Sequence, residues 1–495
     1  MASLIIPLPA ELRPRLPTIV GNVDYQTLRQ RLEQIDSVLR VSGLEKQFIE
    51  RALQGWLKPG GRVPSVREQQ KFQGRSRRAL RCNILRTLLQ EDYRGFSCQL
   101  AGNPLYQWFC LIDALDQIRV PSKSELQRYA HWLPARQMRE LINGLLQSAL
   151  DRPKPLGLRQ ALDLEEYFLD TTALKANIHF PVDWVLLRDG VRTLMKATAL
   201  IRNQGIKGRM EPPEQFLRRI NRLSMEMTHQ RRAADCRKGR KRVLRQMKKL
   251  VKVVRAHARR HRQLLDAKWQ QTPLTRRQAD QVLRRIDQVL ELLPRAQKQA
   301  HERIIGGRLV ENREKILSLY EPDVHVIVRG KAGAEVEFGN TVLMGENRQG
   351  LILDFQIYKE QAPSDAHLLV ESLERVQAGL GRTVGGVAAD RGFSSATNHW
   401  GLKEAGIFNG ICPRGPQQLK KRMKDKKFVN LQRRRSQTEA RISILKNGFL
   451  GRPMRARGFA HREVAVAWGV LTHNLWRLAR LRKTKKKQEP LLQAA

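Results

Sequence analysis

The stretch QRRRSQTEARISILK, residues 432–446, is the part of the chain around which we expect the rest to be organised. It contains neither proline nor glycine, and most of its residues favour or tolerate a helix. At 3.6 residues per turn, such a helix places four polar side chains within a sector of about 60°. These side chains are Gln432, Arg435, Glu439 and Lys446. A lone carboxylate among cations usually marks a solvated helix face, so Glu439 gains meaning only from other acids in the chain.

Two aspartates end short, largely apolar segments elsewhere in the sequence. Asp170 ends EEYFLD and is followed by two threonines, and Asp390 ends VGGVAAD and is followed by Arg391, glycine and phenylalanine. An aspartate after a strand often caps a turn, but strand ends are also where sheet proteins present functional groups. Asp170, Asp390 and Glu439 together therefore form a candidate site.

These motifs carry a resemblance to a known family. The order Asp-Thr-Thr, Asp-Arg-Gly-Phe and Arg-x3-Glu-x6-Lys resembles the DDE transposases of bacterial insertion sequences, over about residues 167–483. Within them it is most similar to the group whose last motif reads Tyr-x2-Arg-x3-Glu-x6-Lys. Arg435, Glu439 and Lys446 match that spacing, whereas Gln432 stands where the family usually has tyrosine. The resemblance implies an RNase H-like fold, with the first acid on the central strand, the second on a neighbouring strand and the third on a helix.

The resemblance also implies a chemistry, phosphoryl transfer on DNA. Two Mg²⁺ ions about 3.5–4 Å apart activate the nucleophile and stabilise the leaving oxygen, and such hard ions prefer carboxylate oxygens. Asp170 is expected to bridge both ions, with Asp390 on one and Glu439 on the other, and Mn²⁺ is expected to substitute. Water first frees a 3′-OH at the element end, and that hydroxyl then attacks target DNA.

Cations near the acids are expected to hold the DNA. Arg435 and Lys446 would clamp phosphates beside the scissile bond. Gln432 could keep a hydrogen bond of the family's tyrosine but not its stacking. Further contacts to DNA are expected from Arg391, Arg242 and Lys249.

The composition points to the same partner. The 495 residues include 92 Lys and Arg against 47 Asp and Glu, a net charge of +45 that favours binding to a polyanion such as double-stranded DNA. No apolar run approaches the ~18 residues that span a bilayer, so no membrane is expected. The five cysteines have no zinc-site spacing, and the N-terminus lacks the features of a secretory signal. We therefore expect a cytoplasmic protein.

Periodicity divides the chain into four parts. Residues 1–150 are expected to be a helical domain that binds the DNA ends, with helices over 25–56 and 79–89 and another capped by Ser122 or Ser124. The alternative for this part is a helical packing or dimerisation domain that never reads a base. An α/β catalytic domain with an RNase H-like mixed sheet follows, over 160–200 and 320–480.

A long basic helical insertion is expected over 201–319, and a flexible basic tail over 481–495. Within the insertion, residues 231–262 hold a single acid, Asp235, and an apolar stripe that would pack the helix. After it, VHVIVRG, AEVEFGNTVLMGE and GLILDFQIY alternate as strands do, and a helix capped by Ser364 is expected over 365–378.

Three functions compete. The first is a transposase that binds terminal inverted repeats, cleaves the element ends and joins the 3′-OH to target DNA, acting as a dimer on DNA because two ends must be held. The second is a catalytically silent, transposase-derived DNA-binding protein. The third is an RNase H-like nuclease or resolvase, which usually carries a fourth acid. Asp189 and Glu166 are available for that role, but neither has a comparable sequence context.

Overall fold

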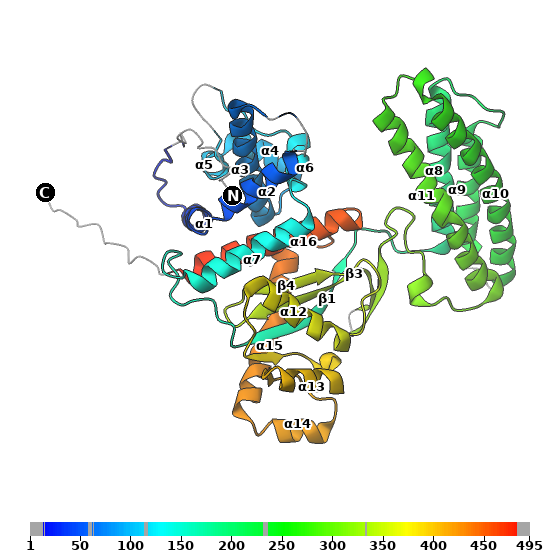
Figure 1. The fold of residues 1–495 in the computed structure, drawn as a ribbon. Helices are drawn as coiled ribbons and strands as arrows, with labels where there is room; N and C mark the ends of the chain where they lie inside the picture. The colour runs from blue at the N-terminus through cyan, green and yellow to red at the C-terminus, as the bar shows by residue number, and fades with distance from the viewer. Residues whose placement is uncertain are drawn as a thin grey trace.

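A mixed sheet lies between a group of N-terminal helices and a knob of short helices, with a separate helical lobe to one side (Figure 1). This computed structural model describes residues 13–482 except 14, 58–61, 63, 113–116, 231–235 and 332–333. Asp235 and the part of the expected tail beyond Arg482 lie outside the described residues. Among the residues described, no helix is long and apolar enough to cross a membrane.

The described strands form one sheet in the order β2-β3-β1-β5-β6, and β4 pairs with β3 as well. Their bounds are Tyr167–Lys175 (β1), His325–Lys331 (β2), Ala334–Asn347 (β3), Ile352–Ile357 (β4), Gly386–Ala388 (β5) and Phe408–Asn409 (β6). β3 runs antiparallel to β1, β2 and β4, whereas β1, β5 and β6 are parallel. The three strands expected between residues 324 and 358 are therefore confirmed, and the mixed sheet is compatible with the expected α/β fold.

The expectation that Asp170 ends its strand is wrong. β1 continues for five residues beyond it, because residues 171–175 keep their antiparallel pairing with residues 339–343 of β3. What ends near Asp170 is the pairing with β5 on the other edge, whose last pair is Phe168 with Ala388.

The N-terminal part is helical, as expected. Its helices are Val23–Val41 (α1), Leu44–Trp56 (α2), Val66–Leu89 (α3), Tyr93–Gly102 (α4), Pro104–Cys110 (α5), Lys123–Ala130 (α6) and Ala135–Asp151 (α7). Gly43, with φ of 75°, splits the helix expected over 25–56 in two. Ser122 begins α6 with a capping box to Glu125, which confirms that prediction.

These helices share one hydrophobic core with the sheet, so the expected boundary near residue 150 does not separate two cores. The last helix, α16 (Phe459–Leu481), lies between them, beside α7 (Figure 1). The Trp468 indole donates to the Ala130 carbonyl at 3.0 Å on the N-terminal side. On the sheet side, the Asn474 amide bonds the backbone N–H and C=O of Ile352 at 2.9 and 2.8 Å.

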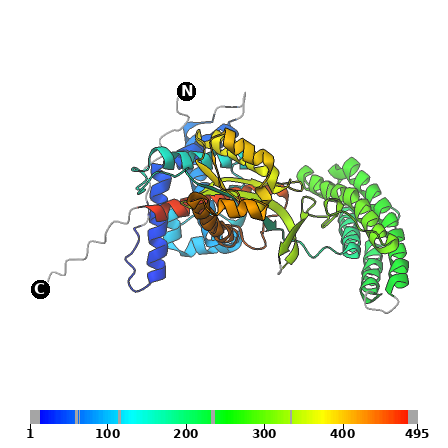
Figure 2. The ribbon, with the colours of Figure 1, turned by 90° about the horizontal axis from the view of Figure 1, so that it is seen from below.

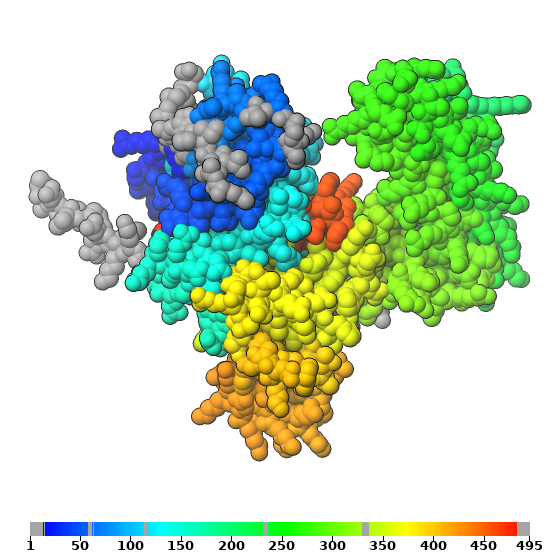
Figure 3. Space-filling model, in the orientation of Figure 1, coloured from blue at the N-terminus to red at the C-terminus, as the bar shows by residue number. Residues whose placement is uncertain are grey.

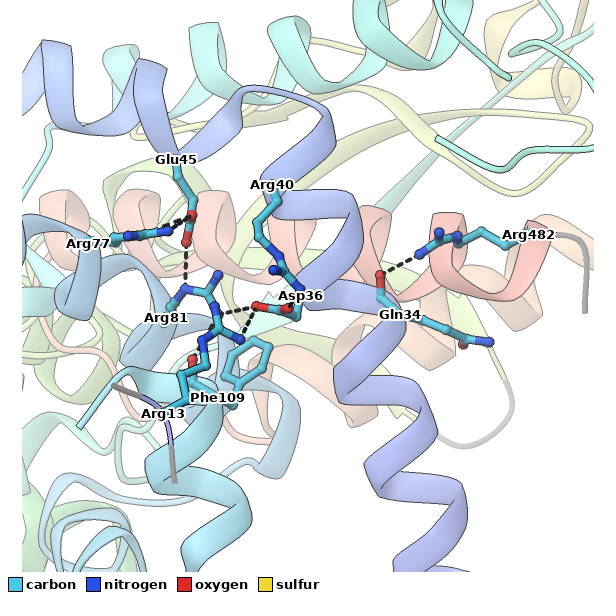
Figure 4. Close-up of polar contacts among 9 residues, drawn as sticks. All are labelled: Arg13, Gln34, Asp36, Arg40, Glu45, Arg77, Arg81, Phe109 and Arg482. Atoms are coloured by element: carbon cyan, nitrogen blue, oxygen red, sulfur yellow. Dashed lines mark hydrogen bonds and ion pairs between the residues drawn. The ribbon is translucent and has the colours of Figure 1, made fainter. Parts of the chain in front are cut away.

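A buried ion network holds α1, α2 and α3 together (Figure 4). The fully buried Arg81 guanidinium donates to Asp36 at 2.7 Å, to the Phe109 carbonyl at 2.9 Å and to Glu45. Burial opposes ionisation of Asp36, but the surrounding cations Arg81, Arg13 and Arg40 outweigh it and lower its pKa. Three helices are thus joined through one guanidinium.

The basic insertion is a four-helix bundle with a core of its own, which forms a separate lobe (Figures 1 and 3). Its helices are Asp183–Asn203 (α8), Pro213–Gln230 (α9), Cys236–Lys268 (α10) and Arg276–His301 (α11). The expected boundary at residue 201 is wrong, because α8 buries its apolar side chains in this bundle rather than against the sheet. Viewed from below, the bundle projects away from the sheet (Figure 2).

The first and last turns of the bundle meet. The buried Asp183 carboxylate accepts from Gln299 at 2.8 Å and from Arg303 at 3.0 Å. The chain then returns to the main core, where the buried Glu321 binds Arg462 and the Gly458 N–H at the start of α16.

The remaining helices surround the sheet and its knob. They are Leu368–Leu380 (α12), Ala396–Glu404 (α13), Pro416–Arg422 (α14) and Lys426–Leu445 (α15). Residues 432–445 are helical, as expected, within α15, and Lys446 opens a π-turn that extends to Leu450. Ser364 makes no capping hydrogen bond among the described residues, and a 3-10 turn, Asp365–His367, precedes α12 instead.

Arg81→Met and Arg40→Met are expected to differ sharply, although both arginines contact Asp36. Arg81 is fully buried, so its loss leaves Asp36 and Glu45 without their shared cation and is expected to cost about 3–5 kcal/mol. Arg40 is 56% exposed, so its loss should cost less than about 1 kcal/mol. Amide hydrogen exchange across α1–α3 measures both opening free energies, and equal losses would contradict the prediction.

Candidate active site

The pairing of β1 with β5 brings two of the expected acids together. The parallel register joins Tyr167 with Val387 and Phe168 with Ala388. Asp170 and Asp390 each lie two residues beyond the last pair. Because parallel strands advance at the same rate, equal steps past a pair end at the same edge. The two carboxylates therefore lie side by side for a reason that the backbone alone sets.

Asp170 is held in an environment that disfavours its charge. Burial, and then the neighbouring Asp390 carboxylate, raise the pKa of Asp170 to about 6. A hydrogen bond from the Thr171 N–H at 2.8 Å and the Arg435 guanidinium act in the opposite direction. Two acids that are buried and this close together are stabilised by added positive charge.

Glu439 comes to the same place from α15. An open cavity of about 750 Å³ is lined by Asp170, Asp390 and Glu439, together with Arg435 and Lys446. Ile442 and Leu445, on the neighbouring face of the helix, are buried. Three acids from a central strand, the end of its neighbour and a helix thus face one cavity.

The type of these side chains fits a hard divalent cation, since carboxylate oxygens are its preferred ligands. Their spacing is wider than a closed site requires. Across the residues that the structure describes, no three His, Cys, Asp or Glu side chains stand close enough together to hold a metal ion. Asp390 also serves as a cap, because its Oδ1 accepts from the Gly392 N–H at 2.9 Å. Binding a metal ion at such a site would require the three carboxylates to move closer together.

Two of the expected DNA-contacting cations line the cavity. Arg435 is half-buried, and its Nε has no hydrogen-bond partner within the described part of the chain. Lys446 is buried, and its ammonium donates to Thr172 Oγ1 at 3.2 Å and to the Ala173 carbonyl at 2.5 Å. Arg435 therefore brings a cation to the wall of the cavity, while Lys446 also fastens the end of α15 to β1.

The other expected contacts lie elsewhere. The Gln432 amide donates to the carbonyls of Ala389 and Gly410 at 3.2 and 2.5 Å, so it binds the protein behind Asp390 rather than facing the cavity. Arg391 is exposed and is not among the residues that line the cavity. Arg242 and Lys249 are exposed on α10 of the bundle, where Arg242 pairs with Glu226 at 3.0 Å.

Sequence reasoning missed a fourth acid beside the site. Asp365 accepts from Thr171 Oγ1 at 3.1 Å, and burial, with a contribution from Asp390, raises its pKa. A Cβ on Gly392 would come within 2.7 Å of Asp365 and 3.0 Å of Asp390, so glycine lets the loop pass between the two. In the sequence, Asp365 reads as an ordinary first-turn acid after Ser364, and nothing there indicates its neighbours.

Asp170→Asn is expected to stabilise the metal-free protein at pH 7.5 by roughly 2–3 kcal/mol. The pKa of Asp170 is about 6 in the folded protein against an ordinary value of 3.8, so ionising this side chain at pH 7.5 costs more free energy in the folded protein than in the unfolded chain. Since the folded pKa is raised, this penalty is absent below about pH 4 and complete above about pH 6. Thermal unfolding of variant and wild type at pH 4 and pH 7.5 measures it. A gain that is the same at both pH values would contradict the assignment.

Part of the chain is similar to a known family. Residues 331–475 match the family model described as the transposase DDE domain. No curated protein and no solved structure gives a significant match. The matched range carries Asp390 and Glu439, while Asp170 precedes it on β1. Over this range the chain is similar to the DDE domain of transposases, which supports the resemblance to DDE-type transposases.

Proposed function

We propose that this transposase binds the terminal inverted repeats of an insertion sequence, cleaves at the element ends and joins the 3′-OH to target DNA. One observation carries the proposal: Asp170, Asp390 and Glu439 line a single cavity together with Arg435 and Lys446. The three acids supply hard oxygen ligands, and the two cations supply partners for phosphate. We also assign the chain to the group with the Tyr-x2-Arg-x3-Glu-x6-Lys signature, with Gln432 as a departure from it.

An RNase H-like catalytic domain is part of the same proposal. In support, β1 is central in the sheet, β5 is its parallel neighbour and β3 its antiparallel neighbour. The first acid lies on the central strand, the second follows the neighbouring strand, and the third lies on a helix, as the resemblance leads one to expect.

Asp170, Asp390 and Glu439 are the residues that would hold the metal. A pair of Mg²⁺ ions, or Mn²⁺ in their place, would supply Lewis acidity for the attacking and leaving oxygens. Arg435 would bind a phosphate oxygen next to the scissile bond, since its guanidinium stays charged and lines the cavity. Lys446 would act in the same way while holding α15 on β1. We do not assign a DNA contact to Gln432, because its amide is already bound.

The rest of the chain would hold the DNA. The net charge of +45 supplies the electrostatic attraction, and exposed cations on α10 of the bundle would contact phosphates. The N-terminal helices would read the terminal repeat. A dimer on DNA follows from the need to hold two ends at once.

Specific observations keep two other functions in view. The wide spacing of the acids fits a catalytically silent, transposase-derived DNA-binding protein. Asp365 fits an RNase H-like nuclease with a fourth acid, since it lies beside Asp170 and Asp390. Cleavage assays on different DNA substrates separate these functions.

Glu439→Gln is expected to lower Mg²⁺-dependent cleavage of a labelled terminal-repeat duplex by roughly 100-fold or more, because even outer-shell partners of metal ligands are worth 10–100-fold. Gel-shift binding should stay unchanged, since the charge lost belongs to the metal site. Glu404→Gln, an exposed glutamate on α13, is the matched control. A wild-type chain that binds the duplex but cuts with neither Mg²⁺ nor Mn²⁺ would favour the silent protein. Preferential cutting of branched DNA would favour the nuclease.

Lys249→Gln is expected to weaken DNA binding several-fold for any sequence and to reduce the salt slope of log K by about 1, as the loss of one phosphate contact does. Arg242→Gln should have a smaller effect, because Arg242 is already paired with Glu226 at 3.0 Å. Fluorescence anisotropy at several salt concentrations measures both variants. If neither changes the slope, the bundle does not track phosphates.

A further inference from the structure

A buried carboxylate lies under the middle of α15, on the sheet side of the helix. Glu346, near the end of β3, is fully buried. Its Oε1 accepts from Thr438 Oγ1 at 3.0 Å and from Arg434 Nη1 at 3.3 Å. Its Oε2 lies 3.9 Å from the Arg441 guanidinium and accepts no hydrogen bond from any described residue. Three side chains of one helix thus converge on one acid.

The positions of these side chains relate them to the cavity. Thr438 immediately precedes Glu439, and Arg434 immediately precedes Arg435. Neighbouring residues on a helix point about 100° apart, so the anchored residues face the sheet while Glu439 and Arg435 face the cavity. Together with the contacts of Gln432 and Lys446 described above, the contacts at Glu346 therefore constrain the rotation of α15 about its own axis.

The same contacts connect α15 to the strand that carries Asp170. Glu346 is the register partner of Phe168 on β1. The Arg434 guanidinium lies over the Phe168 ring, 4.7 Å from its centre, and donates to the carbonyls of Asn347 and Arg348. Any turn of the helix about its axis has to break this set of contacts.

Small rotations matter at this site. With side-chain ends about 6 Å from the helix axis, a turn of about 20° moves the Glu439 carboxylate by about 2 Å. Metal–ligand distances tolerate only about ±0.2 Å. No three His, Cys, Asp or Glu side chains among the described residues form a ready metal site, and α15 carries one of the three acids that line the cavity. The rotation of α15 is therefore one of the settings on which closure of the site depends.

We propose that Glu346 is a positioning residue, which fixes the rotation of α15 through Thr438 and Arg434 and so sets the approach of Glu439 to Asp170 and Asp390. This inference rests on the proposed function, because it assigns Glu439 to a metal site. It does not require Glu346 to touch DNA or metal. It also gives a reason for a full charge in a place where an apolar side chain would be cheaper to bury.

Glu321 provides a matched control. It too is a buried glutamate that binds an arginine, Arg462, and it anchors α16 rather than α15. Glu346→Gln and Glu321→Gln each remove one buried charge and keep the shape of the side chain. Both are expected to lower the melting temperature, so stability alone does not distinguish them.

The test uses the full chain and two readouts. Mn²⁺ affinity is measured by titration calorimetry without DNA, and the Mg²⁺ concentration for half-maximal cleavage is measured on the terminal-repeat duplex. Glu346→Gln is expected to weaken Mn²⁺ binding about 10-fold or more and to raise the Mg²⁺ requirement, as the loss of a residue that orients a ligand does. Glu321→Gln should match wild type in both.

Should Glu346→Gln fail to fold, Thr438→Val removes one of the anchoring hydrogen bonds and leaves the charges in place, and Thr438→Ser should restore wild-type Mn²⁺ binding. Unchanged Mn²⁺ affinity in Glu346→Gln and Thr438→Val, or an equal loss in Glu321→Gln, overturns the inference. If the wild type binds Mn²⁺ but never cuts DNA, the proposed function fails, and the Mn²⁺ affinities still decide the role of Glu346.

Discussion

The short parallel pairing of β1 with β5 is the constraint on which the candidate site depends. It places Asp170 against Asp390 regardless of what their side chains prefer, and burial adds to the cost of two like charges. Positive charge has to come from somewhere else in the fold. α15 brings Arg435 and Lys446 to the same cavity, so the helix that supplies the third acid also supplies the compensation.

The structure repeats one way of docking helices. A carboxylate is buried at the contact, and arginines reach it from the packing elements. Asp36 and Glu45 do this for α1–α3, Asp354 on β4 receives Arg139 of α7 and Arg375 of α12, and Glu346 receives Arg434 of α15. In a chain so rich in arginine, a buried acid pairs with particular arginines, which are then removed from solvent. Each such pair fixes the position of its helix more closely than an apolar contact alone would.

Local patterns predicted much of this fold. The strands from residue 325 to 357, the capping of α6 by Ser122 and the helical stripe of α15 all follow from periodicity and cap residues. Periodicity shows which face of an element is buried, but not which partner buries it. For that reason periodicity places residues 183–200 in the catalytic domain and residues 1–150 in a domain of their own, whereas α8 packs in the bundle and the N-terminal helices share a core with the sheet.

In the candidate site, too, the residues in local motifs could be predicted, whereas those defined by distant partners could not. Asp170, Asp390 and Glu439 were predicted from motifs, and the structure brings all three to one cavity. Asp365 and Glu346 were missed because their partners are far away in sequence: Thr171 and Thr438 respectively. In an alternating strand such as β3, a glutamate is indistinguishable from a solvent-facing residue until the helix that covers it is known.

The meeting of the first and last turns of the bundle, through Asp183 with Gln299 and Arg303, has an evolutionary consequence. A segment with its own core and adjoining ends can be gained, lost or exchanged as one unit, because a short loop is enough to connect the strands on either side in its place. Selection can therefore alter the size and charge of this lobe while the sheet with its acids stays as it is. Lineages that share the sheet are free to differ most in this lobe.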